Sequence, residues 1–296
     1  MKSLRIDIVA PGSSTDIQVI ESAIQILKEK GFQVHCPQNL IRPHLYLANS
    51  DENRFSFLKQ ALENSETDVI WSVRGGYGSN RLLPFLKKMK KPKKEKLFVG
   101  LSDVTSIHSF LNDTWGWRSL HATLLDRIGR QQGSKKDLKQ LLALIRGEAQ
   151  QVSYKIKPLN DFAKKKNSIK AFIRGGNLVT FQSLLGTPFQ PDLSGQILVL
   201  EELSERAYRI DRIIQHLSQS GVLGGVKAVV FGQFLDCEEK DGQVLWPKTL
   251  KEWAEKQEFP VFHGLQVGHA LNQQPLFLNT ASEIKNGVLH NMSGEL

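Results

Sequence analysis

The feature that most limits the fold of this chain is the alternation of short apolar runs with amphipathic segments in its first third. The segments at 16–30 and 51–64 carry apolar residues at helical spacing and predict helices. Strands separated by helices pair in parallel, because each connection has to cross the sheet. The sequence therefore predicts an α/β fold, with an N-terminal Rossmann- or flavodoxin-like domain built on a parallel sheet. Its strands are expected at 6–9, 32–36, 68–73 and 97–100.

In the second half, the spacing of the apolar runs is different. Apolar runs return at 196–200 and 226–231, with a helix expected around 206–218 between them. Before them lies a polar stretch with few apolar positions, interpreted as a linker. We therefore expect a smaller, barrel-like β (α+β) C-terminal domain. The expected boundaries are an N-terminal domain at 1–145, a linker at 146–172 and a C-terminal domain at 173–296.

The charge balance is basic, with 39 Lys and Arg against 30 Asp and Glu in 296 residues. With 40% hydrophobic residues, the composition excludes a disordered chain or a collagen-like repeat. A positive excess fits nucleic acid, an anionic membrane surface or an acidic substrate. The densest lysine run, 87–96, joins a predicted helix to a predicted strand and is interpreted as a solvated connector. We therefore expect no nucleic-acid partner.

Targeting and metal signals are not apparent. No stretch approaches the roughly 18 apolar residues of a membrane span, and the N-terminus does not read as a signal peptide. We expect no membrane association and a cytoplasmic location. Cys36 and Cys237 stand outside any metal-ligand spacing, so no metal is expected. Two buried thiols are the simpler interpretation, and a disulfide between them is the alternative.

The strongest local signal for chemistry surrounds Ser102. An apolar strand ends at Gly100, and a helical pattern begins one tight turn later. A serine at such a turn is lifted out of the sheet beside helix N-terminal amides, as in a nucleophile elbow. The elbow pattern is only half matched, because position 104 is valine. The alternative is that Ser102 or Asp103 simply caps the helix.

A glycine-rich loop follows another predicted strand, as Arg74-Gly75-Gly76-Tyr77-Gly78. Glycines let a backbone approach a ligand closely and direct amides at an oxyanion or phosphate. No Gly-Lys-Ser/Thr follows, so this is not a Walker loop. The alternative is a flexible turn between a strand and a helix.

Two further signals lie in the second half. Glu201 directly follows an apolar strand, where a carboxylate can orient a base, although a solvated strand end is the commoner fate of glutamate. His269 follows Gly268 and a short apolar piece. A structural role is the default for it, as for His108, His121 and His263. Serine, glutamate and histidine in this chain order are compatible with a nucleophile, an orienting group and a base.

Taken together, these pieces resemble the serine LD-carboxypeptidases, a family that includes muramoyl-tetrapeptide carboxypeptidases and microcin C self-immunity proteins. The resemblance covers nearly the whole chain as six motifs in order. They are 8–13, Arg74-Gly75-Gly76-Tyr77-Gly78 with 81–83, 100–105, Gly175-Gly176-Asn177-Leu178 with 184–188, 200–202 with 208–212, and Gly268-His269.

The resemblance implies a triad of Ser102, Glu201 and His269, with the serine from the first domain and the other two from the second. It implies hydrolysis of the amide to a terminal D-residue in a murein tetrapeptide, through an acyl-enzyme and without a cofactor. Family members are often homodimers, so a homodimer is expected here, with a role in peptidoglycan recycling.

The residue chemistry fits these roles. The backbone amides of Asp103 and Gly76 are expected to form the oxyanion hole. The substrate-binding candidates are Arg74, which could bind a substrate carboxylate, and Gly75, Tyr77 and Asn177.

Two departures from the family pattern affect the expected substrate. The family commonly has His-Gly-Pro where this chain reads His121-Ala122-Thr123, and the run 270–277 also differs. One alternative is therefore a microcin-immunity type amidase, for which Trp115, Trp117 or Trp246 could stack on a nucleobase. The other is a non-catalytic binder of an anionic ligand.

Overall fold

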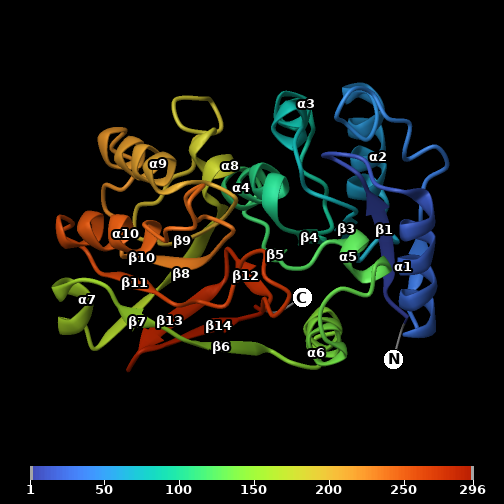
Figure 1. Cartoon of the computed structure of the whole chain (residues 1–296). Coiled ribbons are helices and arrows are strands. Elements are labelled where there is room, and N and C mark those ends of the chain that lie inside the picture. Colours follow the sequence, from blue (N-terminus) through green and yellow to red (C-terminus); the bar gives the residue numbers. More distant parts are fainter. Residues whose placement is uncertain (1–2, 295–296) are drawn as a thin grey trace. The chain divides into compact units, whose positions relative to one another are not determined.

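The computed structural model describes residues 3–294 and divides into two compact units, residues 1–148 and 149–296 (Figure 1). The unit boundary lies close to the end of the expected N-terminal domain. Each unit is built around its own sheet, as the alternation in the first half and the strand signals in the second half predict.

The first unit is the predicted parallel α/β domain. Its strands lie side by side in the order β5-β4-β3-β1-β2, and every pairing among them is parallel. This is the order of a flavodoxin-like sheet. The strands are β1 (Arg5–Val9), β2 (Gln33–His35), β3 (Val69–Ser72), β4 (Leu97–Gly100) and β5 (Ser119–His121).

Helices connect these strands as predicted. The helix expected at 16–30 is α1, which begins after Asp16, whose side chain accepts a hydrogen bond from the Gln18 amide. The helix expected at 51–64 is α2, which is capped by Ser50. The helices of this unit are α1 (Ile17–Glu29), α2 (Asp51–Glu63), η1 (Ser79–Leu82), α3 (Leu83–Lys88), η2 (Ser102–Val104), α4 (Thr105–Thr114), α5 (Leu125–Gly129) and α6 (Lys135–Ile145).

The second unit holds a mixed sheet with strand order β6-β14-β13-β8-β9-β10-β11-β7. Strands β8 to β11 pair in parallel, and the flanking pairings are antiparallel. The two strands that end this order, β6 and β7, follow one another in the chain, so the sheet curls into a nearly closed, barrel-like form. The strands of this sheet are β6 (Gln151–Lys155), β7 (Lys157–Pro158), β8 (Ser168–Asn177), β9 (Ile197–Leu203), β10 (Ala228–Leu235), β11 (Val261–His263), β13 (Ala281–Lys285) and β14 (Val288–Met292). A further short strand, β12 (Leu276–Leu278), is not part of this sheet.

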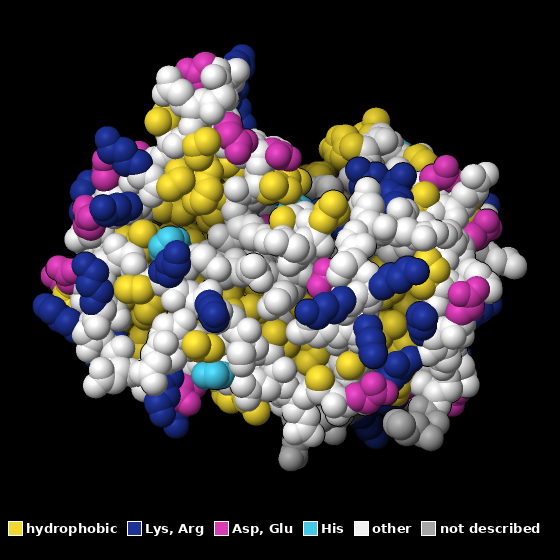
Figure 2. Space-filling model, turned by 60° about the horizontal axis from the view of Figure 1, so that its bottom comes forward, with side chains coloured by type: hydrophobic (Ala, Val, Ile, Leu, Met, Phe, Trp, Pro, Cys, Tyr) yellow, Lys and Arg dark blue, Asp and Glu magenta, His cyan; other side chains and the backbone are white. Residues whose placement is uncertain are grey.

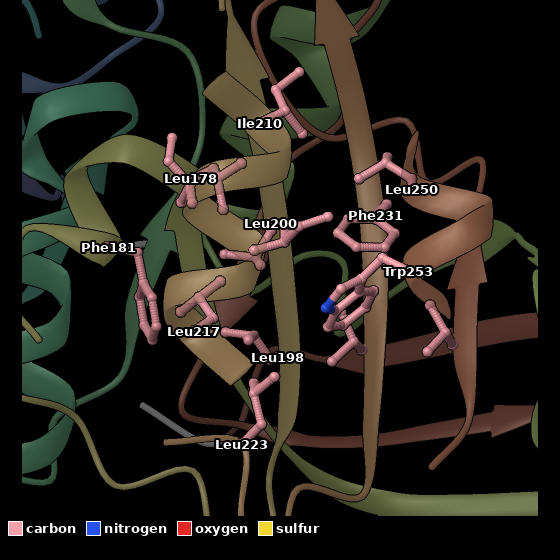
Figure 3. Close-up of a cluster of buried hydrophobic side chains, with 14 of the residues drawn as sticks. Leu178, Phe181, Leu198, Leu200, Ile210, Leu217, Leu223, Phe231, Leu250 and Trp253 are labelled. Atoms are coloured by element: carbon pink, nitrogen blue, oxygen red, sulfur yellow. The ribbon is translucent and has the colours of Figure 1, made fainter. Parts of the chain in front are cut away.

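The core of this unit lies between the parallel strands and three helices (Figure 3). On α9, Ile210, Ile213, Ile214 and Leu217 follow the spacing of one buried helix face. Phe231 and Trp253 meet edge to face, with ring centroids 5.7 Å apart. The helices of this unit are α7 (Asp161–Lys165), α8 (Leu178–Gln182), α9 (Ala207–Gln219) and α10 (Trp246–Glu255).

The stretch expected as a linker, 146–172, belongs largely to the second sheet. It contains β6, β7, α7 and the first half of β8. Along β6 only Val152 and Tyr154 are buried, and the residues between them are exposed. A strand with one face in solvent has few apolar residues, which is why the stretch reads as polar in sequence.

Both cysteines are free thiols, as the simpler interpretation supposed, although Cys36 is only half-buried. The lysine run 87–96 is a connector between α3 and β4. Lys94 pairs with Asp68 at 2.7 Å, and Lys96 is buried. Figure 2 shows Lys and Arg side chains spread over the face in view, with Asp and Glu among them.

Candidate active site

Ser102 is the first residue of η2, two positions after β4 ends at the carboxyl edge of the first sheet. Its backbone has φ of +71°, in the left-handed region that non-glycine residues rarely adopt. Such a conformation costs about 1 to 3 kcal/mol and tends to occur at functional sites. The helix-cap alternative does not hold, because the cap positions are Leu101 for η2 and Val104 for α4, and neither Ser102 nor Asp103 occupies one. The geometry is that of a nucleophile elbow.

Gly75 lies directly against this serine. A side-chain carbon at Gly75 would stand 2.7 Å from the Ser102 Cβ, 2.8 Å from its Oγ and 3.4 Å from the Asp103 amide nitrogen. No real Cβ tolerates the first two distances. Glycine at this position therefore keeps the space beside the Ser102 hydroxyl and the Asp103 amide open.

The carboxylate of Asp103 ties the glycine-rich loop to the elbow. It accepts hydrogen bonds from the amides of Gly78, at 3.1 Å, and Ser79, at 2.8 Å. Burial raises the pKa of Asp103, and these hydrogen bonds offset part of that shift. The Ser79 hydroxyl contacts the Asp103 carbonyl at 2.5 Å and the Ser106 hydroxyl at 2.6 Å. The loop and the elbow are thus one hydrogen-bonded assembly.

A buried arginine also holds the glycine-rich loop in place. The side chain of Arg54 is fully buried and donates to the carbonyls of Pro11 and Gly78. Asp51 balances its charge and also binds Arg81. In the sequence Arg54 looks like any polar residue of an amphipathic helix, so only the packing reveals this role.

The amides predicted to form an oxyanion hole lie in these two segments. The Asp103 N–H is in the first turn of η2, where helix amides have no acceptor within the helix. Gly76 has φ of +85°, and a side chain there would collide with Ser13. Ser13 is held in place because its amide donates to the Gly75 carbonyl at 2.9 Å and its hydroxyl accepts from the Tyr77 amide at 3.2 Å. The oxyanion role of the two amides stays a prediction.

The remaining candidates on this loop are accessible. Arg74 is exposed, and its Nη1 donates to the Ser14 carbonyl at 3.3 Å. Tyr77 is 45% exposed, and its ring meets that of Tyr46 edge to face. Both could contact a ligand, and their substrate-binding role stays a prediction.

In the second unit, the structure brings together the predicted glutamate and histidine. His269 Nδ1 lies 2.6 Å from Glu201 Oε2, and the side chains are 4% and 0% exposed. An ionised carboxylate only accepts hydrogen bonds, so Nδ1 carries the proton. The neutral imidazole then presents Nε2 as an acceptor, which is the tautomer that a general base requires.

Two glycines make room for this pair. A side-chain carbon at Gly268 would lie 3.2 Å from Glu201 Oε2 and 2.9 Å from the Gln233 Cβ. At Gly232 it would lie 3.2 Å from the Glu201 Cβ. Gln233 also holds the histidine loop, since its amide donates to the Val267 carbonyl and its Oε1 accepts from the Ala270 amide. Gln233 is a supporting residue that sequence reasoning missed.

Next to Glu201, Glu202 has a separate, structural set of contacts. It accepts hydrogen bonds from the amides of Leu203 and Val179 and from the Asn177 side chain, at 2.8 to 3.0 Å. Burial raises the pKa of Glu202 to about 7. Asn177, a predicted substrate-binding residue, also caps α8 through the Thr180 amide. The structure thus shows Asn177 as a cap and a partner of Glu202, and its contact with substrate stays a prediction.

Other candidates lie in the cores. His108 is buried and hydrogen-bonds the Gly100 carbonyl at 3.0 Å, and burial lowers its pKa to about 3. Trp115 and Trp117 are buried against each other, and Trp246 stacks on Phe234. Their packing leaves Trp115 and Trp117 no exposed face for a nucleobase, against the stacking suggested for them.

Within residues 3–294, no cluster of three or more potential metal-ligating side chains occurs. No helix in this range is long and apolar enough to span a membrane.

Comparison with known proteins gives the context for these two groups of residues. Residues 6–122 match the family model of the LD-carboxypeptidase N-terminal domain, and residues 170–284 match that of the C-terminal domain. A relative in Rickettsia conorii, named as an inferred carboxypeptidase, is 34% identical over 96% of this chain and 89% of its own length.

Two solved structures share the fold. Muramoyltetrapeptide carboxypeptidase from Oxalobacter formigenes aligns with a TM-score of 0.83 and 27% identity, covering 98% of this chain and 99% of its own. The protein MccF, solved with glutamyl sulfamoyl guanosine, aligns with a TM-score of 0.83 and 17% identity, covering 99% and 97%.

Proposed function

The chain belongs to the LD-carboxypeptidase family, and from that premise we propose that it is a serine hydrolase that releases the C-terminal D-alanine of murein tetrapeptides. The observation that carries the proposal is the strained backbone of Ser102, whose hydroxyl lies beside a position that only glycine can occupy. The buried Glu201–His269 pair supports it. The activity named for the Oxalobacter formigenes protein suggests the substrate.

In the proposed mechanism, the Ser102 Oγ attacks the carbonyl carbon of the amide to the terminal residue. His269 Nε2 takes the hydroxyl proton, and Glu201 stabilises the resulting imidazolium. The amides of Asp103 and Gly76 hold the oxyanion, and one such donor is typically worth roughly 3 kcal/mol of barrier. The C–N bond then breaks, and His269 returns the proton to the leaving amine.

The remaining acyl-enzyme is hydrolysed by the same groups. His269 takes a proton from water as the water attacks the ester carbonyl, and it returns the proton to Ser102 Oγ as the ester bond breaks. This restores the enzyme and frees the shortened peptide. The scheme requires that Ser102 of the first unit and His269 of the second meet in the working enzyme.

The direct test is to incubate the protein with L-Ala-γ-D-Glu-mDAP-D-Ala and measure free D-alanine. We expect release by the native protein and at least a 1,000-fold slower release by Ser102→Ala and by His269→Ala. Ser56→Ala, an exposed serine on α2, is the matched control and should retain full activity. Equal release by Ser102→Ala would refute the nucleophile.

The same assay separates the alternatives. An amidase of the microcin-immunity type would cleave an aminoacyl-sulfamoyl nucleotide faster than the tetrapeptide. A non-catalytic binder would cleave neither. DNA binding with a steep dependence on salt would favour a nucleic-acid role for the lysines.

The wider biology belongs to the same proposal. We propose that the enzyme works in the cytoplasm, in the recycling of peptidoglycan, as a homodimer, because family members commonly do so. Cells lacking it should accumulate tetrapeptides, and light scattering should give about twice the chain mass of 33.4 kDa. A monomer at working concentrations would reject the dimer.

A further inference from the structure

A buried carboxylate that the proposed mechanism does not use lies behind the glycine-rich loop. Asp126 stands in the first turn of α5 and is 8% exposed. Its backbone amide donates to the carbonyl of Val73, the residue before Arg74, at 3.0 Å. Its Oδ1 is buried and accepts no hydrogen bond from the described residues. A buried polar atom without a hydrogen bond lowers the stability of the folded protein, so its presence suggests a functional role.

The segment before Asp126 is anchored to the strands that carry the candidate site. The Trp71 Nε1 on β3 donates to the Thr123 carbonyl at 3.0 Å, and the Ala122 amide donates to the Gly100 carbonyl at 3.0 Å. The carboxylate is therefore set on the same rigid frame as the glycine-rich loop and the Ser102 elbow. That frame allows Asp126 to act on the loop with little freedom of its own.

Burial raises the pKa of Asp126, and the positive charge of Arg74 opposes that shift, as do the charges of Arg127 and Arg130. Arg74 is tethered by one nitrogen to the Ser14 carbonyl, and Arg130 by one nitrogen to the Thr15 hydroxyl, each at 3.3 Å. Among residues 3–294, no carboxylate forms an ion pair with Arg74 within 4.0 Å. The exposed guanidinium of Arg74 is thus held by the Ser14 carbonyl, and most of its N–H donors remain available to a ligand.

A carboxypeptidase has to recognise the free carboxylate of the terminal residue that it releases. The carboxylate of the leaving residue is three bonds from the scissile carbonyl carbon, which is less than about 4 Å. Its binding group must therefore lie close to the oxyanion donors. Arg74 is two residues from Gly76, the proposed donor, and a guanidinium matches a carboxylate with two parallel hydrogen bonds.

Building on the proposed function, we infer that Arg74 recognises the free C-terminal carboxylate of the substrate and that Asp126 is its positioning residue. Holding the long side chain in place lowers the conformational entropy lost on binding. This pair would make the enzyme select a free terminus and reject an amidated one.

Binding to Ser102→Ala protein tests this inference without turnover. The probes are the murein tetrapeptide and the same peptide with a C-terminal carboxamide, measured by calorimetry. We expect the Ser102→Ala protein to bind the free acid about 10- to 100-fold more tightly than the amide. Adding Arg74→Gln should abolish the preference, and Arg74→Lys should restore part of it.

The role of Asp126 is tested in the same background. Asp126→Asn should lose part of the preference, and combining it with Arg74→Gln should add nothing further, since the carboxylate acts through the arginine. Thermal unfolding shows whether Asp126→Asn is folded. If it folds poorly, Asp126→Glu is used in its place, because glutamate keeps the negative charge. Arg42→Gln, at an exposed arginine whose Nη2 donates to Asn39 Oδ1, is the matched control and should keep the full preference.

The turnover assay provides the second reading. In otherwise native protein, Arg74→Gln and Asp126→Asn should raise KM for the free acid and change kcat less than about threefold. A free-acid preference that survives Arg74→Gln overturns the inference, and strict additivity of the two substitutions overturns the positioning role. If the native protein cleaves nothing while binding still discriminates through Arg74, the proposed hydrolysis fails and this inference stands.

Discussion

The Nδ1 atom of His269 lies 2.6 Å from the Glu201 carboxylate, although 68 residues separate them in sequence. Both side chains are almost completely excluded from solvent. Burial strengthens a charge-assisted hydrogen bond, because the surrounding dielectric is low. The pair therefore fixes both the orientation and the tautomer of the imidazole.

Replacing Glu201 by Gln tests the importance of that tautomer. The substitution preserves size, but the amide can donate to Nδ1 and so stabilise the wrong tautomer. We expect kcat for D-alanine release to fall by roughly 1,000- to 10,000-fold with a small change in KM. The measurement is steady-state kinetics, with thermal unfolding to check the fold. Glu238→Gln, at an exposed glutamate, should be neutral; near-native kcat for Glu201→Gln would exclude the orienting role.

Replacing Gly75 by Ala tests the open space beside Ser102. The new methyl group would stand 2.7 Å from the Ser102 Cβ, so the loop or the elbow has to move. A displacement on the scale of 1 Å can cost about 100-fold in rate, and we expect a loss of at least that size in kcat.

The control for Gly75→Ala is Gly31→Asn. Gly31 has open space around its Cα, and asparagine tolerates its positive φ. Circular dichroism should show both variants folded. Full activity in the alanine variant would mean that the serine hydroxyl does not depend on this contact.

Glu202 should give the protein a measurable dependence of stability on pH. Its pKa is about 7 in the folded protein, against an ordinary value of 4.5. Between these pH values the folded protein keeps a proton that the unfolded chain has released, so this contribution is complete at low pH and is lost as the pH rises toward 7. One pKa unit corresponds to about 1.4 kcal/mol, which makes the loss roughly 3 kcal/mol.

Urea unfolding at pH 5 and pH 7.5 measures this effect. In Glu202→Gln the free energy of unfolding should fall less between the two pH values than in the native protein, even if the variant is less stable at both. Glu238→Gln should keep the native dependence. An unchanged dependence in Glu202→Gln would show that another group is responsible.

Much of the fold could be predicted because its signals are local. The helix expected at 51–64 is found at 51–63, and the turn after Gly100 carries Ser102 as the pattern indicated. Periodicity and turn residues within a short window report on backbone conformation directly. The order of serine, glutamate and histidine likewise came from the short segments around each residue.

Other features depend on partners that are distant in the chain. The stretch 146–172 looks like a linker because β6 has one solvent-facing side and pairs with β14, more than 130 residues later. Arg54 reads as a surface residue, and its burial appears only when the loops at Pro11 and Gly78 close over it.

The sequence by itself determined the fold class and the turn that carries Ser102, and it predicted the candidate residues of the proposed site, since these follow from residue type and local spacing. Only the tertiary structure decided that Glu201 meets His269, that Asn177 serves Glu202, and that Asp126 stands behind Arg74. The first two are contacts between separate elements, and the third follows from the hydrogen bond between the Asp126 amide and the Val73 carbonyl. Such contacts arise when burial excludes water and the remaining polar groups must find partners, which local patterns do not specify.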